Sequence, residues 1–305
     1  MKKVFILIFI CFNLTIINAQ KKSVKYGILE VYENYKSVNV QARNIGVWLP
    51  QNYSPKKKYA VLYMHDGQML FDSTTTFNKT EWGVDECLTK LMREGKIKNT
   101  IVIGIWNTKE NRHQEYFPQK PYESLSKEEK ENVGVSLKKI GMSAEFTPSS
   151  DNYLKFIVEE LKPFIDSTYS TLIDKENTFI AGSSMGGLIS MYAVCEYPNV
   201  FGGAACLSTH WPGTFEVENN PIPEIFYNYL TNNLPKPNQN KFYFDYGTEE
   251  LDALYPPLQT KVDAIMKSKG FSNENWITQK FEGENHSENA WKKRLHIPME
   301  FLLKR

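Results

Sequence analysis

Residues 177–195 read NTFIAGSSMGGLISMYAVC, and this stretch decides how the chain folds. An apolar run typical of a strand ends at Ala181, a Gly-x-Ser-x-Gly turn follows at 182–186, and a helix-length segment continues from Gly187 towards Pro198. A strand, a sharp turn and a helix form the context in which a serine is lifted out of a sheet as a nucleophile. The unpaired N–H groups at the start of the helix carry partial positive charge. We therefore predict that Ser184 is a nucleophile next to an oxyanion site.

Apolar segments on both sides of this stretch predict a mostly parallel sheet. The continuous run at 59–64 is typical of a strand buried on both faces. Further strands are predicted at 42–49, 99–105, 202–207, 242–246 and 276–281. Helices are predicted between the strands, at 86–94, 153–165 and 258–270, and from 287 to the end of the chain. Such alternation predicts one α/β domain with helices on both faces of the sheet.

Two prolines predict irregular helices. Pro163 is expected to kink the helix at 153–165, and Pro298 to interrupt the last helix. The long polar segment at 106–141 is predicted to cap the site. No linker, repeat or low-complexity tract divides the chain, so residues 20–305 are predicted to be a single domain.

The first nineteen residues resemble a targeting segment rather than part of the fold. Lys2 and Lys3 precede a nearly apolar run from 4 to 17, and Ala19 offers a small residue for cleavage. The run is short for a transmembrane helix, so no stable membrane span is predicted. We predict a signal peptide over 1–19 and a periplasmic or secreted protein.

Composition limits the classes of partner and cofactor. The formal net charge is +1 over 305 residues, which argues against a nucleic-acid partner. No cluster of potential ligands has metal-site spacing, and no Gly-rich phosphate or dinucleotide motif occurs, so neither a metal nor an organic cofactor is predicted. Without the leader the chain keeps an odd number of cysteines, which argues against a disulfide framework. Cys195 and Cys206 lie in apolar segments and are predicted to be buried thiols.

A serine hydroxyl needs a base, and the base needs an acid that orients it. In a fold of this kind the chain order is serine, acid, histidine. His286 follows the last predicted strand and precedes the last helix, so it is predicted to be the base. The acid is predicted in the loop after the strand at 242–246, where Glu249, Glu250 and Asp252 all stand. From position alone, either Glu250 or Asp252 could reach His286.

The oxyanion site requires two N–H groups. One is predicted to belong to Met185, the residue after the nucleophile. The other is predicted in the loop after the strand at 59–64, where we favour the N–H of Gln68. Asp66 in the same loop, together with His210 and Trp211 after the strand at 202–207, are predicted to contact substrate.

These residues resemble the putative-esterase family of α/β-hydrolases, from about residue 43 to 303. The family includes enterochelin-esterase-like, feruloyl and acetyl-xylan esterases. The resemblance lies in the sequences VLYMHDGQ at 61–68, GSSMGG at 182–187, LSTHWP at 207–212 and NHSENAW at 285–291. It implies an α/β-hydrolase fold, a nucleophilic Ser184, a basic His286, and oxyanion donors at Gln68 and Met185. A Gly-Thr-Glu-x-Leu-Asp pattern in a secreted bacterial subgroup implies Asp252 as the acid, whereas the wider family spacing implies Glu250; we rank Asp252 first.

The expected activity is therefore that of an exported serine carboxylic-ester hydrolase without a cofactor. Its expected substrate is a small-molecule or carbohydrate ester, for example an acylated carbohydrate or a siderophore-type ester. The same three residues would also serve an acyltransferase or a peptidase. A protein of another class, which binds a carbohydrate or siderophore on a hydrolase scaffold without catalysis, would be supported by the loss of one of the three residue types. The sequence contains all three.

Overall fold

The computed structural model describes residues 19–139, 145–216 and 219–305. The predicted leader over residues 1–19 lies outside the described residues except for Ala19. In the described residues, nine strands form a single sheet in the order β1-β2-β3-β5-β4-β6-β7-β8-β9. Their bounds are β1 Gln20–Lys22, β2 Ile28–Tyr35, β3 Arg43–Leu49, β4 Ala60–His65, β5 Thr100–Ile105, β6 Thr178–Ser183, β7 Gly203–Leu207, β8 Lys241–Tyr246 and β9 Trp276–Lys280.

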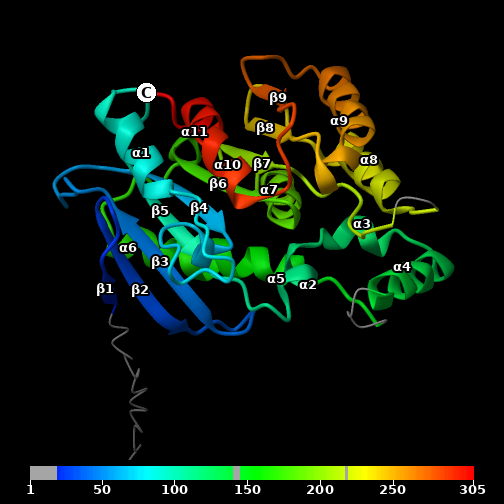
Figure 1. Ribbon diagram of the computed structural model, residues 1–305, viewed down its shortest axis with the longest axis horizontal. Coiled ribbons are helices and arrows are strands. Elements are labelled where there is room, and N and C mark those ends of the chain that lie inside the picture. The colour runs from blue at the N-terminus through cyan, green and yellow to red at the C-terminus, as the bar shows by residue number, and fades with distance from the viewer. Residues whose placement is uncertain (1–18, 140–144, 217–218) are drawn as a thin grey trace, which may run out of the picture.

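Strand direction divides the sheet into two parts. The neighbours from β5 through β9 pair in parallel, whereas β1, β2 and β3 add an antiparallel edge next to β5. Figure 1 shows this antiparallel edge at one end of the molecule and β8 and β9 at the other. The fold is therefore the predicted α/β-hydrolase type, with the predicted strands present and β1 and β2 added.

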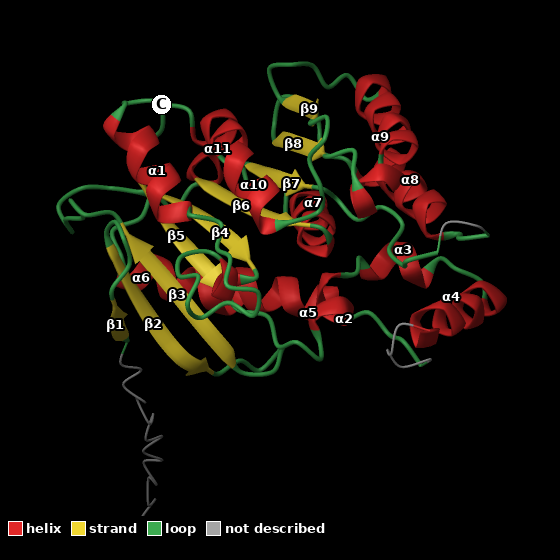
Figure 2. Cartoon of the chain, in the orientation of Figure 1, coloured by secondary structure: helices red, strands yellow, loops and turns green. Residues whose placement is uncertain are grey.

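Helices connect the strands and cover both faces. Their bounds are α1 Val84–Arg93, α2 Arg112–Tyr116, α3 Gln119–Glu123, α4 Lys127–Lys139, α5 Ser150–Lys155, α6 Lys162–Thr168, α7 Met185–Glu196, α8 Ile222–Asn233, α9 Pro256–Ser268, α10 Glu288–Arg294 and α11 His296–Leu303. Figure 2 shows α1, α10 and α11 in front of the sheet. Within the segment at 106–141, predicted to cap the site, the described residues 106–139 include three of these helices, α2, α3 and α4.

The strands are apolar on both faces, and each face has its own core. Val61, Tyr63 and Ile180 point into the core covered by α5 to α9. The alternate residues Leu62 and Phe179 point into the core covered by α1, α10 and α11. This period of two, with both faces buried, explains why these strands are continuous apolar runs. Because both faces are packed, the sheet holds the loops at its carboxyl edge in fixed positions.

Pro163 and Pro298 affect their helices in ways that differ in detail from the predicted kink and interruption. Before Pro163 the helix widens into a π-helical segment, η2 (Phe156–Leu161), and then continues as α6. Proline has no N–H and crowds the carbonyl one turn earlier, which disrupts the regular α-helical ladder. The last helix breaks at Leu295 rather than at Pro298, because Pro298 lies in the first turn of α11, where no N–H is needed.

Candidate active site

Ser184 stands in a strained turn between β6 and α7. Its backbone has φ 57° and ψ −123°, a region that residues with side chains rarely occupy. The turn is anchored to β7 because the Ser184 N–H donates to the carbonyl of Leu207 (2.9 Å). A Cβ at Gly182 would lie 2.8 Å from backbone atoms of Gly186, so the small residues of the motif are required by space. The sequence thus places Ser184, half-buried, at the mouth of a cleft.

His286 reaches the same cleft from the loop between β9 and α10. Ser287 caps α10 through its hydroxyl, which accepts the N–H of Ala290, so the loop is fixed immediately after the histidine. His286 Nδ1 lies 2.5 Å from Asp252 Oδ1. In the described residues no hydrogen bond joins Ser184 Oγ to His286, and such contacts are often longer in a free enzyme than in its substrate complex.

Asp252 is the carboxylate that the structure brings to His286. It lies, fully buried, in a short 3₁₀ helix, η4 (Glu250–Leu254). Its second oxygen, Oδ2, accepts hydrogen bonds from Ser208 Oγ and from the N–H of Gly247, both at 2.6 Å. Burial alone would raise the pKa of Asp252. The hydrogen bond and charge of His286, together with the hydrogen bonds from Ser208 and Gly247, outweigh burial and hold this pKa below its ordinary value. Glu249 and Glu250 are exposed, so the alternative acid Glu250 is not placed at the histidine.

The two predicted oxyanion donors have free N–H groups. Neither the Met185 N–H nor the Gln68 N–H has an acceptor among the described residues. Gln68 lies in η1 (Gly67–Met69), directly after β4. A Cβ at Gly67 would lie 2.4 Å from the backbone of Gly104, so glycine lets this loop pack closely against β5. The side chain of Gln68 accepts the Asn107 N–H (3.2 Å), which fixes the loop from the other side.

Asp66 lines the cleft, but its carboxylate is already engaged. Arg112 donates to both of its oxygens (2.8 and 2.7 Å), and Asn107 Nδ2 donates to Oδ1 (2.7 Å). Burial would raise the pKa of Asp66, but the charge and hydrogen bonds of Arg112 outweigh it and lower the pKa. Asp66 is thus paired with Arg112 at the cleft, and Arg112 is the more accessible of the two side chains. The contact of Asp66 with substrate stays a prediction.

His210 and Trp211 are not placed where the sequence suggested. Trp211 has no exposed surface, and its indole N–H donates to Gln259 Oε1 (2.7 Å). His210 is 2% exposed and contacts Tyr255 Oη through Nδ1 (2.9 Å). Burial lowers the pKa of His210 to about 3, so it remains neutral. We correct both assignments: neither side chain lines the cleft, because both are buried and their hydrogen bonds to Gln259 and Tyr255 hold them in the interior.

His65 is excluded as a base by the same reasoning. It ends β4, is 2% exposed, and contacts Tyr153 Oη through Nδ1 (2.9 Å). Burial lowers the pKa of His65 to about 3. Among the described residues that line the cleft, His286 is therefore the one histidine available for proton transfer.

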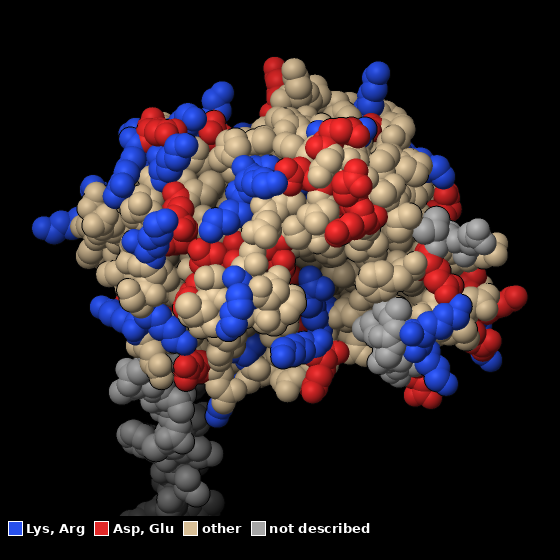
Figure 3. Space-filling view, viewed as in Figure 1, with Lys and Arg blue, Asp and Glu red and all other residues tan. Residues whose placement is uncertain are grey.

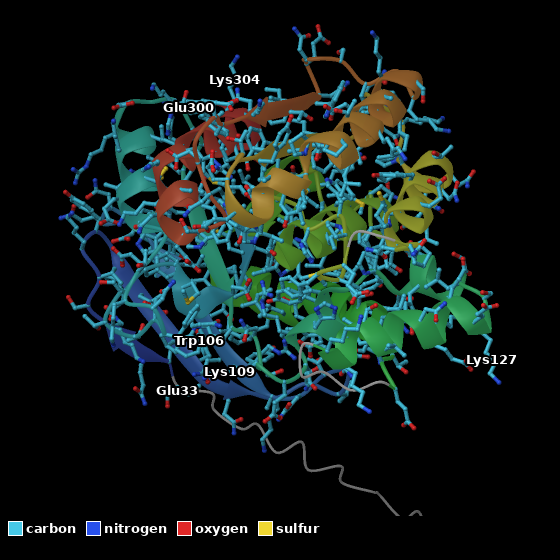
Figure 4. The ribbon with its side chains drawn as sticks, turned by 45° about the vertical axis from the view of Figure 1, so that its right-hand side comes forward. Glu33, Trp106, Lys109, Lys127, Glu300 and Lys304 are labelled. Carbon is cyan, nitrogen blue, oxygen red and sulfur yellow. The ribbon has the colours of Figure 1, made fainter. Side chains whose placement is uncertain are left out.

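The cleft has a volume of about 390 Å³ and is lined by polar and aromatic side chains. Phe77 is 80% exposed at its edge, and the rings of Trp82 and Trp291 lie 5.3 Å apart in its wall. Figure 3 shows a hollow near the middle of this face, with side chains of both charges around it. Lys109, which lines the cleft, is seen with Trp106 in the loop after β5 in Figure 4. In the parts of the chain that the structure describes, no cluster of three potential metal ligands occurs.

A comparison with protein families shows to which family the chain belongs. The model of the family described as "Putative esterase" matches residues 39–297, which include every residue of the site above. The chain belongs to the putative esterase family. It is accordingly an esterase, as its α/β-hydrolase fold and serine turn indicated.

Three proteins of stated activity are similar to this esterase at low sequence identity. An endo-1,4-beta-xylanase/feruloyl esterase of Xylanibacter ruminicola is 23% identical over 296 residues, which are 94% of this chain and 33% of the relative. A ferulic acid esterase of Anaeromyces mucronatus, solved with ferulic acid, has a TM-score of 0.60 at 19% identity and covers 94% and 95% of the two chains. A ferric enterobactin esterase of Salmonella typhimurium has a TM-score of 0.62 at 14% identity, covering 92% of this chain and 59% of that one. At these identities the solved structures show the shared fold.

Three residues of the esterase site were not identified from sequence. Arg112 braces Asp66, Ser208 binds Asp252, and Arg294 is buried next to Ser208. Ser208 lies in the stretch at 207–212 singled out above, but nothing in that stretch shows where its hydroxyl points. Arg294 follows two lysines in a helix and therefore has the pattern of a surface residue, although it stands three positions after Trp291 on one helix face.

Proposed function

We propose that the protein is an exported serine esterase in which Ser184, His286 and Asp252 form the catalytic triad. The observation that carries the proposal is the 2.5 Å contact of His286 Nδ1 with a buried Asp252, on a histidine that shares its cleft with Ser184. A carboxylate at Nδ1 fixes the tautomer that leaves Nε2 free to accept a proton. The chemistry is then a transfer of an acyl group to the serine and from there to water.

The proposed steps are those of serine-hydrolase chemistry in general. Ser184 Oγ attacks the ester carbonyl while His286 Nε2 accepts the hydroxyl proton. The N–H groups of Met185 and Gln68 stabilise the negative charge on the carbonyl oxygen, each contributing about 3–4 kcal/mol in comparable enzymes. His286 then gives its proton to the leaving alcohol, and an acyl-enzyme remains. Water, deprotonated by His286, attacks the acyl-enzyme and releases the acid.

For the substrate we propose an ester of an aromatic acid, carried by a carbohydrate or a similar polyol. The exposed ring of Phe77 and the paired rings of Trp82 and Trp291 provide faces on which an aromatic acyl group can stack. The polar side chains of Asn107, Lys109 and Glu288 at the same cleft suit hydroxyl groups. Two of the similar proteins named above act on feruloyl esters, which supports the same class here.

The nucleophile can be tested by covalent labelling. A fluorophosphonate probe is expected to label the wild type at Ser184 and to leave Ser184→Ala unlabelled. The variant should lose several powers of ten in kcat while its fold is intact, because only Oγ is removed. Methyl ferulate, an aryl acetate and an acetylated xylan together would identify the acyl preference. Hydrolysis by Ser184→Ala above about 1% of the wild-type rate would contradict the proposed nucleophile.

Export is the second part of the proposal. The charged start, the apolar run and Ala19 support a cleaved leader. The strand β1 begins at Gln20 and pairs with β2, so the residue that follows the predicted cleavage point belongs to the sheet. Within the described residues, no helix is long and apolar enough to cross a membrane.

A further inference from the structure

Behind Asp252 lies a buried polar group of side chains that the proposed triad does not include. Ser208, the first residue after β7, has no exposed surface. Its Oγ contacts Asp252 Oδ2 (2.6 Å), Trp291 Nε1 (2.9 Å) and Arg294 Nη2 (2.8 Å). Indole and guanidinium nitrogens can only donate hydrogen bonds. The Ser208 hydroxyl must therefore accept from both of them and donate its own proton to Asp252.

Arg294 places a positive charge next to two buried carboxylates. Its side chain is 3% exposed and donates to Asp245 through Nε (3.2 Å) and Nη2 (2.9 Å). The same Nη2 lies 4.0 Å from Asp252 Oδ2. Asp245 and Asp252 together carry two negative charges and Arg294 carries one positive charge. One negative charge is left unbalanced, and it faces the imidazole of His286 through Asp252 Oδ1.

Ser208 also connects the acid to the helix that follows the base. Trp291 and Arg294 are three residues apart on α10 and so share one face of that helix. Both donate to Ser208, while His286 immediately precedes the α10 cap. The ring of Trp291 meets the imidazole of His286 edge-on, with centroids 5.0 Å apart. One hydroxyl thus fixes the distance between the element carrying Asp252 and the element that follows His286.

We propose that Ser208, held by Arg294 and Trp291, is a positioning residue of the esterase. It acts through Asp252. Its hydroxyl donates a hydrogen bond to Oδ2, which reduces the negative charge that His286 experiences and orients Oδ1 towards the imidazole. Arg294 orients the hydroxyl and limits the excess of negative charge. The proposal rests on the triad proposed above.

The test is the kinetics of Ser208→Ala as a function of pH, with methyl ferulate or an aryl acetate as substrate. We expect kcat to fall by about 10- to 100-fold, the usual effect of losing a hydrogen bond to a charged group, with KM changed less than about threefold. More negative charge on Asp252 favours the protonated imidazole, so the acidic limb of the kcat/KM profile should move to higher pH. Rates are normalised by titration with the fluorophosphonate, which counts only folded enzyme.

Ser150→Ala is the matched control. Ser150 is also fully buried, and its Oγ accepts the N–H of Gln119 (2.9 Å) in a part of the chain that does not contact the triad. This variant should lose stability, but its kcat and its pH profile should match those of the wild type. Ser208→Cys, which restores an S–H donor, should recover part of the lost kcat, and it provides the same comparison should the alanine variant fold poorly.

The outcomes separate this inference from the proposed triad. If Asp252→Asn keeps wild-type activity, the triad assignment fails and the role of Ser208 fails with it. If Asp252→Asn is inactive but Ser208→Ala keeps the kcat and pH profile of Ser150→Ala, the triad stands and the positioning role of Ser208 is overturned. A lower melting temperature alone, without the change in pH profile, would also overturn it.

Discussion

At the scale of single residues, the two oxygens of Asp252 have different surroundings. Oδ1 faces His286, whereas Oδ2 accepts hydrogen bonds from Ser208 and from the Gly247 N–H. A carboxylate with donors on both oxygens is fixed in orientation and stays ionised. It can therefore hold the imidazole in one tautomer while the reaction proceeds.

This difference predicts unequal effects of two neighbouring substitutions. Asp252→Asn should lower kcat by about two to four powers of ten, because the amide cannot support the same tautomer of His286. Glu250→Gln is the matched control: it removes a charge two residues away that is exposed to solvent, and should change kcat by less than about tenfold. Steady-state kinetics of the two purified variants decide the matter. Collapse of Glu250→Gln with an active Asp252→Asn would assign the acid to Glu250.

At the scale of elements, the turn that carries Ser184 is tightly packed. The end of β6 and the start of α7 pass so closely that a Cβ on Gly182 would lie 2.8 Å from Gly186 backbone atoms. A Cβ on Gly186 itself would find His65 Cβ at 3.5 Å, an ordinary contact. The two glycines of the motif therefore have different reasons to be glycine.

We predict that Gly182→Ala and Gly186→Ala behave differently. Gly182→Ala forces the strand and helix apart and should destabilise the protein by about 1–3 kcal/mol, the usual cost of overpacking. Gly186→Ala lies inside the first turn of α7 and should be close to neutral, because alanine favours a helix. Chemical denaturation of both variants measures the difference. Equal stability of the two would show that the turn can relax.

At the scale of the whole molecule, the site is assembled from distant segments at one edge of the sheet. β4, β6, β7 and β8 run parallel, so the loops that carry Gln68, Ser184, Ser208 and Asp252 all leave from the same side. The carboxyl edge of a parallel sheet is the usual place for a site in such folds. His286 arrives there from β9, at the end of the sheet opposite the antiparallel strands.

The proposed export makes a prediction about the whole chain. Cells that express all 305 residues should yield a mature protein that begins at or near Gln20, the first residue of β1. N-terminal sequencing of protein from the extracytoplasmic fraction measures this directly. As a control, Lys3 and the apolar run can be deleted, which should retain the protein in the cytoplasm. Intact Met1 outside the cytoplasm would contradict a cleaved leader.

Sequence predicted the interior of the sheet because buried parallel strands are continuous apolar runs, as at Val61 and Ile180. It missed β2, whose Glu30 and Glu33 interrupt the apolar pattern, and α8, which follows a proline-rich turn. Cys195 and Cys206 are free and buried, as predicted.

For the site, motif and chain order were sufficient to bring Ser184 and His286 to one cleft. The acid was ambiguous because its orientation depends on the turn of η4, which residue types alone do not determine. Trp211 was misplaced for a similar reason: an aromatic residue after a strand can turn outward or inward, and here it packs on Phe244 in the core. Arg294 was missed because a charged helical residue is ordinarily exposed.

The backbone of Ser184 has a consequence for how such a protein can change over generations. A residue with a side chain at φ 57° costs about 1–3 kcal/mol, whereas glycine adopts this conformation without that cost. Replacing the nucleophile by glycine would relieve the turn, at the smaller entropic cost that glycine adds in the unfolded chain. If Ser184 is the nucleophile, a single substitution to glycine would thus give a protein that is more stable but inactive, so selection for ester cleavage would be needed to keep a serine in this turn.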